Sequence, residues 1–248
     1  MKYPFLEKNE LLLIDYVPGS SGQLLMRIWS EFDATMNYDN PRLLTSNTIT
    51  VHPASKEIDY DIQIPKRITN WFLNRCEPSG VQDYIQFFEF LGTFLIASSQ
   101  RWIRGSNNKK FYDDENYTLE GSRIIYGIHS WKANIPYKEM QALGYNVRCI
   151  TIIPTTDRGI KYQHDRFQLC YPHPEEVMHD YFIDFNKKPS IESFDLCTLL
   201  LDKNTDAIIK WFQINIGSNF RKDKIPYIKQ LLDLYYIEVI DNVSTVPN

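Results

Sequence analysis

A run of small residues, Pro18-Gly19-Ser20-Ser21-Gly22, has the residue types best suited to bind a charged ligand. It follows the apolar run Leu11 to Ile14 and leads into an amphipathic helical pattern, Gly22 to Phe32. Glycine permits a tight turn and a close ligand approach, and free amides at a helix N-terminus favour an anion. Ser20 and Ser21 could add hydroxyl donors. The pattern predicts a phosphate cradle, although glycine and serine are common in any tight strand-to-helix turn.

The loop lacks the lysine of an ATP-dependent phosphate loop. Counted from Gly19, the second Gly and the Lys of GxxxxGK[ST] fall on Leu24 and Leu25. This disfavours an ATP-dependent kinase or ATPase. Arg27 is expected to form an i,i+4 pair with Glu31 on the solvent face rather than to replace the lysine.

His129 is a second candidate for chemistry, because it follows the apolar run Ile124 to Ile128 and precedes Ser130, Trp131 and Lys132. A side chain at the carboxyl end of a parallel strand lies where open α/β sheets bind ligands. Imidazole is suited to take a proton from a hydroxyl near neutral pH. A partly buried histidine without chemistry is an equally good interpretation.

A third segment combines an apolar run with a helix start. Val147 to Ile153 ends at Pro154-Thr155-Thr156-Asp157, where Thr156 or Asp157 is expected to be the N-cap of a helix. Arg158 and Lys161 lie near the start of that helix and could meet a second phosphate. The alternative is that both cations are solvated surface charges.

The elements expected around these residues alternate between strands and helices, which predicts an α/β domain with a parallel sheet. The predicted strands are Leu11 to Ile14, Ile124 to Ile128, Val147 to Ile153 and Leu196 to Leu201. The predicted helices are Gly22 to Phe32, the apolar and buried Val81 to Ile103, Ile135 to Leu143 ending at Gly144, Asp206 to Ile214, and Lys224 to Tyr236. Residues 36–80 and 105–122 are expected to be irregular insertions in a single domain spanning 1–248.

Composition narrows the class of protein. The chain has 248 residues, 43% hydrophobic and 23% charged, which is typical of a globular domain. A net charge of −4 makes a nucleic-acid partner improbable. The chain shows no signal peptide and no apolar run long enough for a membrane span, so we expect a cytoplasmic protein without a membrane partner.

The four cysteines of the chain, Cys76, Cys149, Cys170 and Cys197, form no CxxC pair and are expected to be buried free thiols.

No metal site is expected. The run HPEEVMH places His173 and His179 six residues apart, which does not bring them to one helix face. The basic run around Trp102, from Arg101 to Lys110, is expected to be a solvated linker, although it could contact an anion.

The order of these segments resembles the P-loop sulfotransferase family. The matching stretches are YVPGSSGQLL, IYGIHSWKANIP, CITIIPTTDRGIKY and IESFDLCTLLLDKNTDAIIKWF, about a third of the chain. The resemblance implies a three-layer P-loop-type fold with a mainly parallel central sheet flanked by helices. It also implies transfer of a sulfuryl group from 3′-phosphoadenosine 5′-phosphosulfate (PAPS) to a hydroxyl or amine of a small-molecule or glycan acceptor.

The resemblance also implies roles for individual residues. Gly19 to Gly22, with Gln23, would bind the donor, His129 would take the acceptor's proton, and Lys132 would steady the sulfuryl oxygens. Arg158 and Lys161 would compensate for the family's 3′-phosphate ligands, which this chain lacks.

The chain departs from the family pattern at three positions. The loop lacks the family's lysine, and Pro154 and Lys161 stand near the positions of the arginine and the serine that usually bind the 3′-phosphate. These departures leave a second hypothesis, a non-catalytic binding or virion-associated protein on the same scaffold. A nucleotide-dependent kinase is a third and weaker one.

Overall fold

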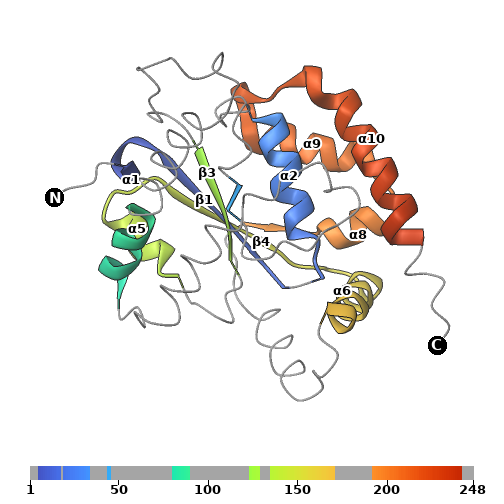
Figure 1. Cartoon of the computed structure of the whole chain (residues 1–248), viewed down its shortest axis with the longest axis horizontal. Coiled ribbons are helices and arrows are strands. Elements are labelled where there is room, and N and C mark those ends of the chain that lie inside the picture. The colour runs from blue at the N-terminus through green and yellow to red at the C-terminus, as the bar shows by residue number, and fades with distance from the viewer. Residues whose placement is uncertain are drawn as a thin grey trace, which may run out of the picture.

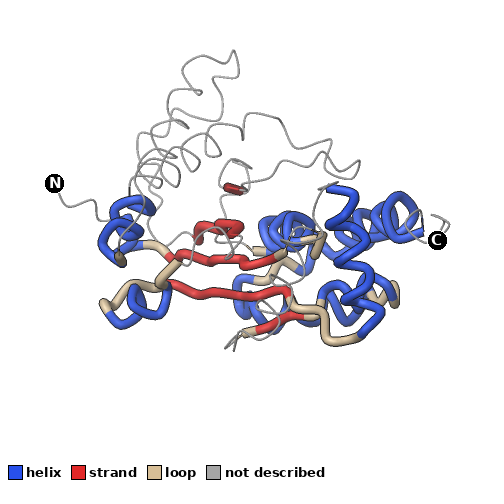
Figure 2. Tube along the Cα trace, turned by 90° about the horizontal axis from the view of Figure 1, so that it is seen from below, coloured by secondary structure: helices blue, strands red, loops and turns tan. Residues whose placement is uncertain are grey.

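A parallel five-stranded sheet organises the part of the chain that the computed structural model describes, namely residues 5–17, 19–33, 44–45, 80–89, 123–128, 135–170 and 192–241. The strand order is β2-β3-β1-β4-β5, and every neighbouring pair is parallel. Figure 2 shows the strands one above another in the middle of the described part of the chain, with helices to either side of them. The strands are β1 (Glu10–Tyr16), β2 (Leu44–Thr45), β3 (Arg123–Ile128), β4 (Val147–Ile152) and β5 (Ser193–Phe194).

The central strand β1 is buried on both faces, which explains why its sequence does not alternate between apolar and polar residues. Leu11 to Ile14 are at most 1% exposed. Leu13 pairs with Tyr126 of β3 on one side and with Cys149 of β4 on the other. The sequence predicts parallel strands of one sheet at the apolar runs Leu11 to Ile14, Ile124 to Ile128 and Val147 to Ile153. This prediction is confirmed.

Helices connect the strands and cover both faces of the sheet. In Figure 1, α2, α9 and α10 lie together at one side of the strands. The labelled helices are α1 (Phe5–Lys8), α2 (Gly22–Phe32), α5 (Tyr137–Ala142), α6 (Asp157–Cys170), α8 (Leu196–Leu201), α9 (Thr205–Ile216) and α10 (Ile225–Tyr235), and residues 81–89 are also helical. Short 3₁₀ turns at Gly217–Asn219 and Lys222–Lys224 link α9 to α10, and a π-helical turn, Tyr236–Ile240, continues α10.

Helices α2 and α5 lie on opposite faces of the sheet. The methyl group of Met26 in α2 approaches Gly127 of β3. Burial, helped by the nearby Cys149 and Asp15, raises the pKa of Tyr137 in α5. Because successive strand residues point to opposite faces, Gly127 and Asp15 mark the two different faces.

Aromatic packing holds α2 in place. Trp29 and Phe32 are completely buried, and their ring centroids lie 5.8 and 5.7 Å from that of Phe212 in α9. These contacts fix α2 and therefore the loop that precedes it. Helix α2 has the bounds that the sequence predicts.

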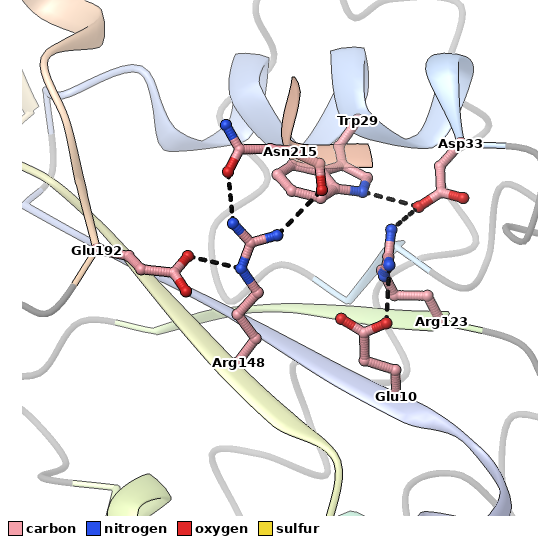
Figure 3. Close-up of polar contacts among 7 residues, drawn as sticks. All are labelled: Glu10, Trp29, Asp33, Arg123, Arg148, Glu192 and Asn215. Carbon is pink, nitrogen blue, oxygen red and sulfur yellow. Dashed lines mark hydrogen bonds and ion pairs between the residues drawn. The ribbon is translucent and has the colours of Figure 1, made fainter. Parts of the chain in front are cut away.

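An ionic cluster closes the amino ends of the strands (Figure 3). Arg123 at the start of β3 binds both Glu10 and Asp33, and Trp29 donates a hydrogen bond to Asp33 at 2.9 Å. Arg148 in β4 binds Glu192 and the side-chain and backbone oxygens of Asn215. The guanidinium carbons of the two arginines lie 5.6 and 5.7 Å from the centre of the Trp29 ring. We call these seven residues the amino-end cluster.

The predicted strand Leu196 to Leu201 is wrong, because these residues form helix α8. The Asp195 side chain accepts a hydrogen bond from the Thr198 amide at 3.0 Å and so caps the helix. The adjacent strand, β5, is only two residues long. An apolar run of six residues suits a buried helix as well as a buried strand, so its pattern could not distinguish them.

Other expectations are met in part. The helix expected over Ile135 to Leu143 begins at Tyr137, and Gly144 follows it in a left-handed conformation, with φ of 90°. Residues 81–89 of the predicted long helix are helical, but Gln82 and Gln86 are exposed, so this part is amphipathic rather than apolar all round. Its remainder lies outside the described residues.

The Arg27–Glu31 pair is confirmed, at 2.8 Å, but it is not on a solvent face. The Arg27 guanidinium also donates to the Tyr227 hydroxyl of α10 at 2.9 Å. The two side chains retain only 17% and 6% of their exposure. Helix α10 therefore covers a surface of α2 that the sequence pattern alone assigns to solvent.

Of the predicted insertions, residues 36–80 contribute the edge strand β2, and 105–122 lie outside the described residues. Cys149 and Cys197 are free thiols, the first half-buried and the second buried. Across the described ranges, we find no helix with both the length and the apolar character needed to cross a bilayer.

Candidate functional site

The strand order singles out the carboxyl ends of β1 and β4. These two strands are neighbours, but the chain leaving β1 goes towards β2, whereas the chain leaving β4 goes towards β5 on the opposite edge. Where successive connections diverge in this way, open α/β sheets leave a crevice that binds ligands. The loop before Gly22 and the segment 153–156 both begin there.

The loop after β1 is tight and packs directly on α6. Gly19 has a φ of 96°, and a Cβ added to it would lie 2.7 Å from the Gln163 carbonyl oxygen. A Cβ on Gly22 would lie 2.3 Å from the Tyr16 ring. Both positions therefore require glycine, and close contacts with the protein itself explain that requirement. Helix α2 begins at Gly22, so its first amides face this loop.

Ser20 is completely buried, and its hydroxyl oxygen accepts a hydrogen bond from the Gln163 side-chain amide of α6. The Ser20 amide donates to the Val17 carbonyl oxygen at 3.0 Å. The hydroxyl hydrogen bond holds the loop against α6, and the amide hydrogen bond closes the turn after β1. The sequence identified Ser20 as a candidate donor but could not identify Gln163, 143 residues away, as its partner.

Three hydroxyl groups converge beside the start of α2. The Ser21 Oγ lies 2.6 Å from the Tyr235 hydroxyl of α10 and 3.5 Å from the Tyr162 hydroxyl of α6, and the two tyrosine hydroxyls are 3.4 Å apart. We call Ser21, Tyr162 and Tyr235 the hydroxyl triad. Ser21 is left-handed, with φ of 62°, and its side chain does not cap α2.

The hydroxyl triad is electrically neutral. Burial, and the neighbouring Tyr235, raise the pKa of Tyr162 well above its ordinary value of 10.0. Tyr162 is therefore a protonated donor at any physiological pH. Its position in α6, one residue before Gln163, places the triad beside the loop.

Gln163 and Arg166 complete this side of the loop. Gln163 is completely buried, and in the described part of the chain its Oε1 has no hydrogen-bond partner. The Arg166 guanidinium lies 5.8 Å from the centre of the Tyr162 ring, and its Cβ would be 3.2 Å from a Cβ at Gly19. The sequence analysis missed both residues. The helical spacing of residues 159, 163, 166 and 167 was the signal that could have found them.

Arg158 and Lys161 are engaged elsewhere. Arg158 donates to Asp202 at 3.0 Å and to the Leu201 carbonyl oxygen at 3.2 Å, at the end of α8. Lys161 pairs with Asp165 at 2.7 Å, one turn along α6. Both side chains are about two-thirds exposed, at 65% and 67%. In the described part of the chain, Arg158 therefore contacts the end of α8 and Lys161 contacts Asp165 of its own helix. Neither contact is with the loop.

The segment after β4 is anchored by Asp195. One carboxylate oxygen of Asp195 accepts from the Thr155 amide at 2.7 Å and from its hydroxyl, while the other caps α8. Thr156 accepts from the Gly159 amide at 3.1 Å, as an N-cap does, so the first of the two predicted capping residues is confirmed. Asp195 and Thr155 are 40 residues apart, and no sequence pattern indicates that they form a hydrogen bond.

Several predicted residues cannot be placed. His129, Lys132, Pro18 and the HPEEVMH run lie outside the described residues. The side chain of Gln23 is also not described. Within the described ranges no group of three or more His, Cys, Asp or Glu side chains is arranged to hold a metal ion.

Comparisons of the chain with protein-family models, with curated proteins and with solved structures found no match.

Proposed function

We propose that this chain is a sulfotransferase-like transferase with a three-layer P-loop-type fold, which holds the phosphosulfate of a PAPS-type donor at Gly19 to Gly22. One observation carries the proposal. The loop leaves the central strand at the switch point between β1 and β4 and runs directly into the N-terminus of an eleven-residue helix. That arrangement offers backbone amides and a favourable helix dipole to an anion.

The reaction needs a group that accepts a proton and groups that stabilise the leaving phosphate. The acceptor's oxygen or nitrogen would form a new bond to sulfur, and the bond from sulfur to the bridging oxygen would break. The bridging oxygen leaves with the phosphate, where amides of the loop would stabilise its charge. His129 would receive the acceptor's proton. Lys132 would bind the sulfuryl oxygens.

A non-catalytic binding protein is the second candidate, because the polar groups expected to serve a ligand already have partners. Ser20 and Ser21 are bonded to Gln163 and Tyr235, and Arg158 is paired with Asp202. This hypothesis differs from the first in one respect: it requires no turnover.

The donor site is tested by calorimetry with adenosine 3′,5′-bisphosphate, the product that remains after sulfuryl transfer. We expect saturable binding and a rise in melting temperature at ligand concentrations above Kd. Binding of ATP without binding of the bisphosphate would favour a kinase. The absence of heat and of a thermal shift at millimolar ligand would contradict the proposed donor.

The enzyme and binding-protein hypotheses are separated by His129→Ala. If His129 is the base, the variant keeps its melting temperature and its affinity for the bisphosphate, and turnover falls by about 10²–10⁴-fold. A variant that melts early, or that turns over at the wild-type rate, removes His129 from the mechanism.

A further inference from the structure

The hydroxyl triad occupies the place where a phosphate-binding loop of this kind needs donors that its sequence lacks. Ser21 is the residue before α2, and Tyr162 and Tyr235 reach its side chain from α6 and α10, so three separate parts of the chain bring a hydroxyl to the residue that precedes this helix. Tyr162 and Tyr235 are 4% and 3% exposed. Tyr162 is the last residue of the stretch CITIIPTTDRGIKY, Tyr235 belongs to no motif, and the loop itself has no lysine.

The distances within the triad show which protons are available. The Ser21–Tyr235 bond, at 2.6 Å, is a short hydroxyl hydrogen bond. The two contacts of Tyr162, at 3.5 and 3.4 Å, are at the limit for a hydrogen bond and are correspondingly weak. Each hydroxyl has one proton to donate. The Tyr162 hydroxyl is therefore only weakly held within the triad, and its proton can turn to a ligand oxygen at little cost.

Gln163 gives a second and independent indication of a ligand beside the loop. Its carboxamide is completely buried and binds Ser20, yet its Oε1 has no partner within the described ranges. An unmet buried acceptor is costly and is normally satisfied in the working state of a protein. A hydroxyl of a bound phosphate or ribose is the kind of group that would donate to it.

We propose that Ser21, Tyr162 and Tyr235 bind an oxyanion of the phosphate type at the start of α2, as neutral hydroxyl donors in place of the missing lysine. The inference rests on the proposed function and names the side chains that hold its anion. The charge of the bound group is balanced by the α2 dipole and by Arg166, which lies against the Tyr162 ring.

The test measures binding of inorganic phosphate and of adenosine 3′,5′-bisphosphate to wild type, Tyr162→Phe, Tyr235→Phe and the double variant. A hydrogen bond to a charged group supports an expected loss of about 10-fold in affinity for each single variant, and more for the double variant. Tyr236→Phe is the matched control. Its hydroxyl is 2.9 Å from Thr205, and it is as deeply buried as Tyr235, which precedes it. We expect Tyr236→Phe to bind both probes as wild type does.

A measurement on the wild type covers the case in which a variant does not fold. With ¹³C-labelled tyrosine, adding phosphate should shift the Cζ resonances of Tyr162 and Tyr235 and leave that of Tyr236 in place. An unchanged Cζ resonance of Tyr162 at saturating phosphate would overturn the inference.

The outcomes separate this inference from the proposed function. If wild type binds the bisphosphate and the Tyr→Phe variants bind it equally well, the loop amides suffice, so the triad has no role while the proposed donor site stands. A higher affinity of Tyr235→Phe would show that Tyr235 obstructs the loop, which also overturns the inference. If wild type binds neither probe, both proposals fail.

Discussion

The two ends of the central strands carry polar clusters of opposite character. At the amino ends, Arg123 and Arg148 are each bound to carboxylates and both lie against the Trp29 ring. At the carboxyl ends, the hydroxyl triad is neutral, two of its three contacts are long, and Gln163 next to it has an unmet acceptor. Each end has an unmet buried atom in the described part of the chain, Arg123 Nε at the amino ends and Gln163 Oε1 at the carboxyl ends, but the amino-end cluster pairs its charges within the protein, whereas the carboxyl-end hydroxyls are weakly held.

This difference indicates that the amino-end cluster contributes to stability, and it is compatible with the binding site that we propose at the carboxyl ends. Removing the partner of a buried charge is expensive, so the Arg123–Asp33 pair is expected to contribute strongly to stability. Neutral hydroxyls can exchange one partner for another at a small cost. A ligand site therefore fits the carboxyl ends, where the chain connections also diverge.

The largest effect is expected from Asp33→Ala. Asp33 is completely buried and accepts hydrogen bonds from Trp29 and Arg123, so its removal leaves the Arg123 guanidinium with Glu10 alone among these carboxylates. Breaking a buried pair in this way costs about 3–5 kcal/mol in the free energy of unfolding. Urea denaturation measures it. Asp202→Ala, which breaks an exposed pair, is the control and should change stability by at most about 1 kcal/mol.

A smaller loss is expected from Gly19→Ala, which tests how tightly the loop is fixed. Two causes add: a φ of 96°, and a Cβ 2.7 Å from a backbone oxygen of α6. Gly144→Ala has a similar φ of 90° with no atom within 4 Å, so it isolates the first cause. We expect about 1 kcal/mol for Gly144→Ala from its φ alone and about 2–4 kcal/mol for Gly19→Ala, where overpacking is added. Equal losses would mean that the loop can move away from α6.

What the sequence could predict follows from local patterns. The run Leu11 to Ile14 is apolar without alternation, which is enough to indicate a central strand buried on both faces. Gly22 to Phe32 has one continuous apolar stripe, and its bounds agree with those of α2. The run Leu196 to Leu201 is also apolar without alternation, but it forms a helix, which the side chain of Asp195 caps.

The sequence could predict only the part of the candidate site whose residues are adjacent along the chain. The glycines and serines of the loop are adjacent in sequence, but Tyr162, Gln163 and Tyr235 approach the loop through packing of α6 and α10. A tyrosine in an amphipathic helix is usually a core residue, so these positions carry no distinguishing signal. Arg158 and Lys161 have the right charge near a helix start, but their direction on α6 is set by Asp202 and Asp165.

The pH dependence of stability provides a further test of the buried, neutral triad. Because the pKa of Tyr162 is raised in the folded protein, the unfolded chain loses this proton first as the pH rises past 10.0. The contribution of Tyr162 to the free energy of unfolding is therefore complete below pH 10. Above pH 10 it decreases, by up to about 1.4 kcal/mol for each pH unit. Urea denaturation between pH 8 and pH 11.5 should show a smaller decrease for Tyr162→Phe than for wild type. Parallel curves would mean that the Tyr162 hydroxyl is open to water.

The smallest effect on stability is expected from Arg158→Ala, and its value lies in the comparison with Arg166→Met. The Arg158–Asp202 pair is mostly exposed, so its loss should cost less than about 1 kcal/mol. Its guanidinium is held at the end of α8, and we expect the affinity for adenosine 3′,5′-bisphosphate to stay at the wild-type value. Arg166 lies against Tyr162 beside the loop, and Arg166→Met should weaken that affinity. Calorimetry on both variants decides between the two arginines. If Arg158→Ala lowers the affinity and Arg166→Met does not, the ligand's second phosphate lies at the start of α6, as the sequence predicts, and the cation that balances it is Arg158.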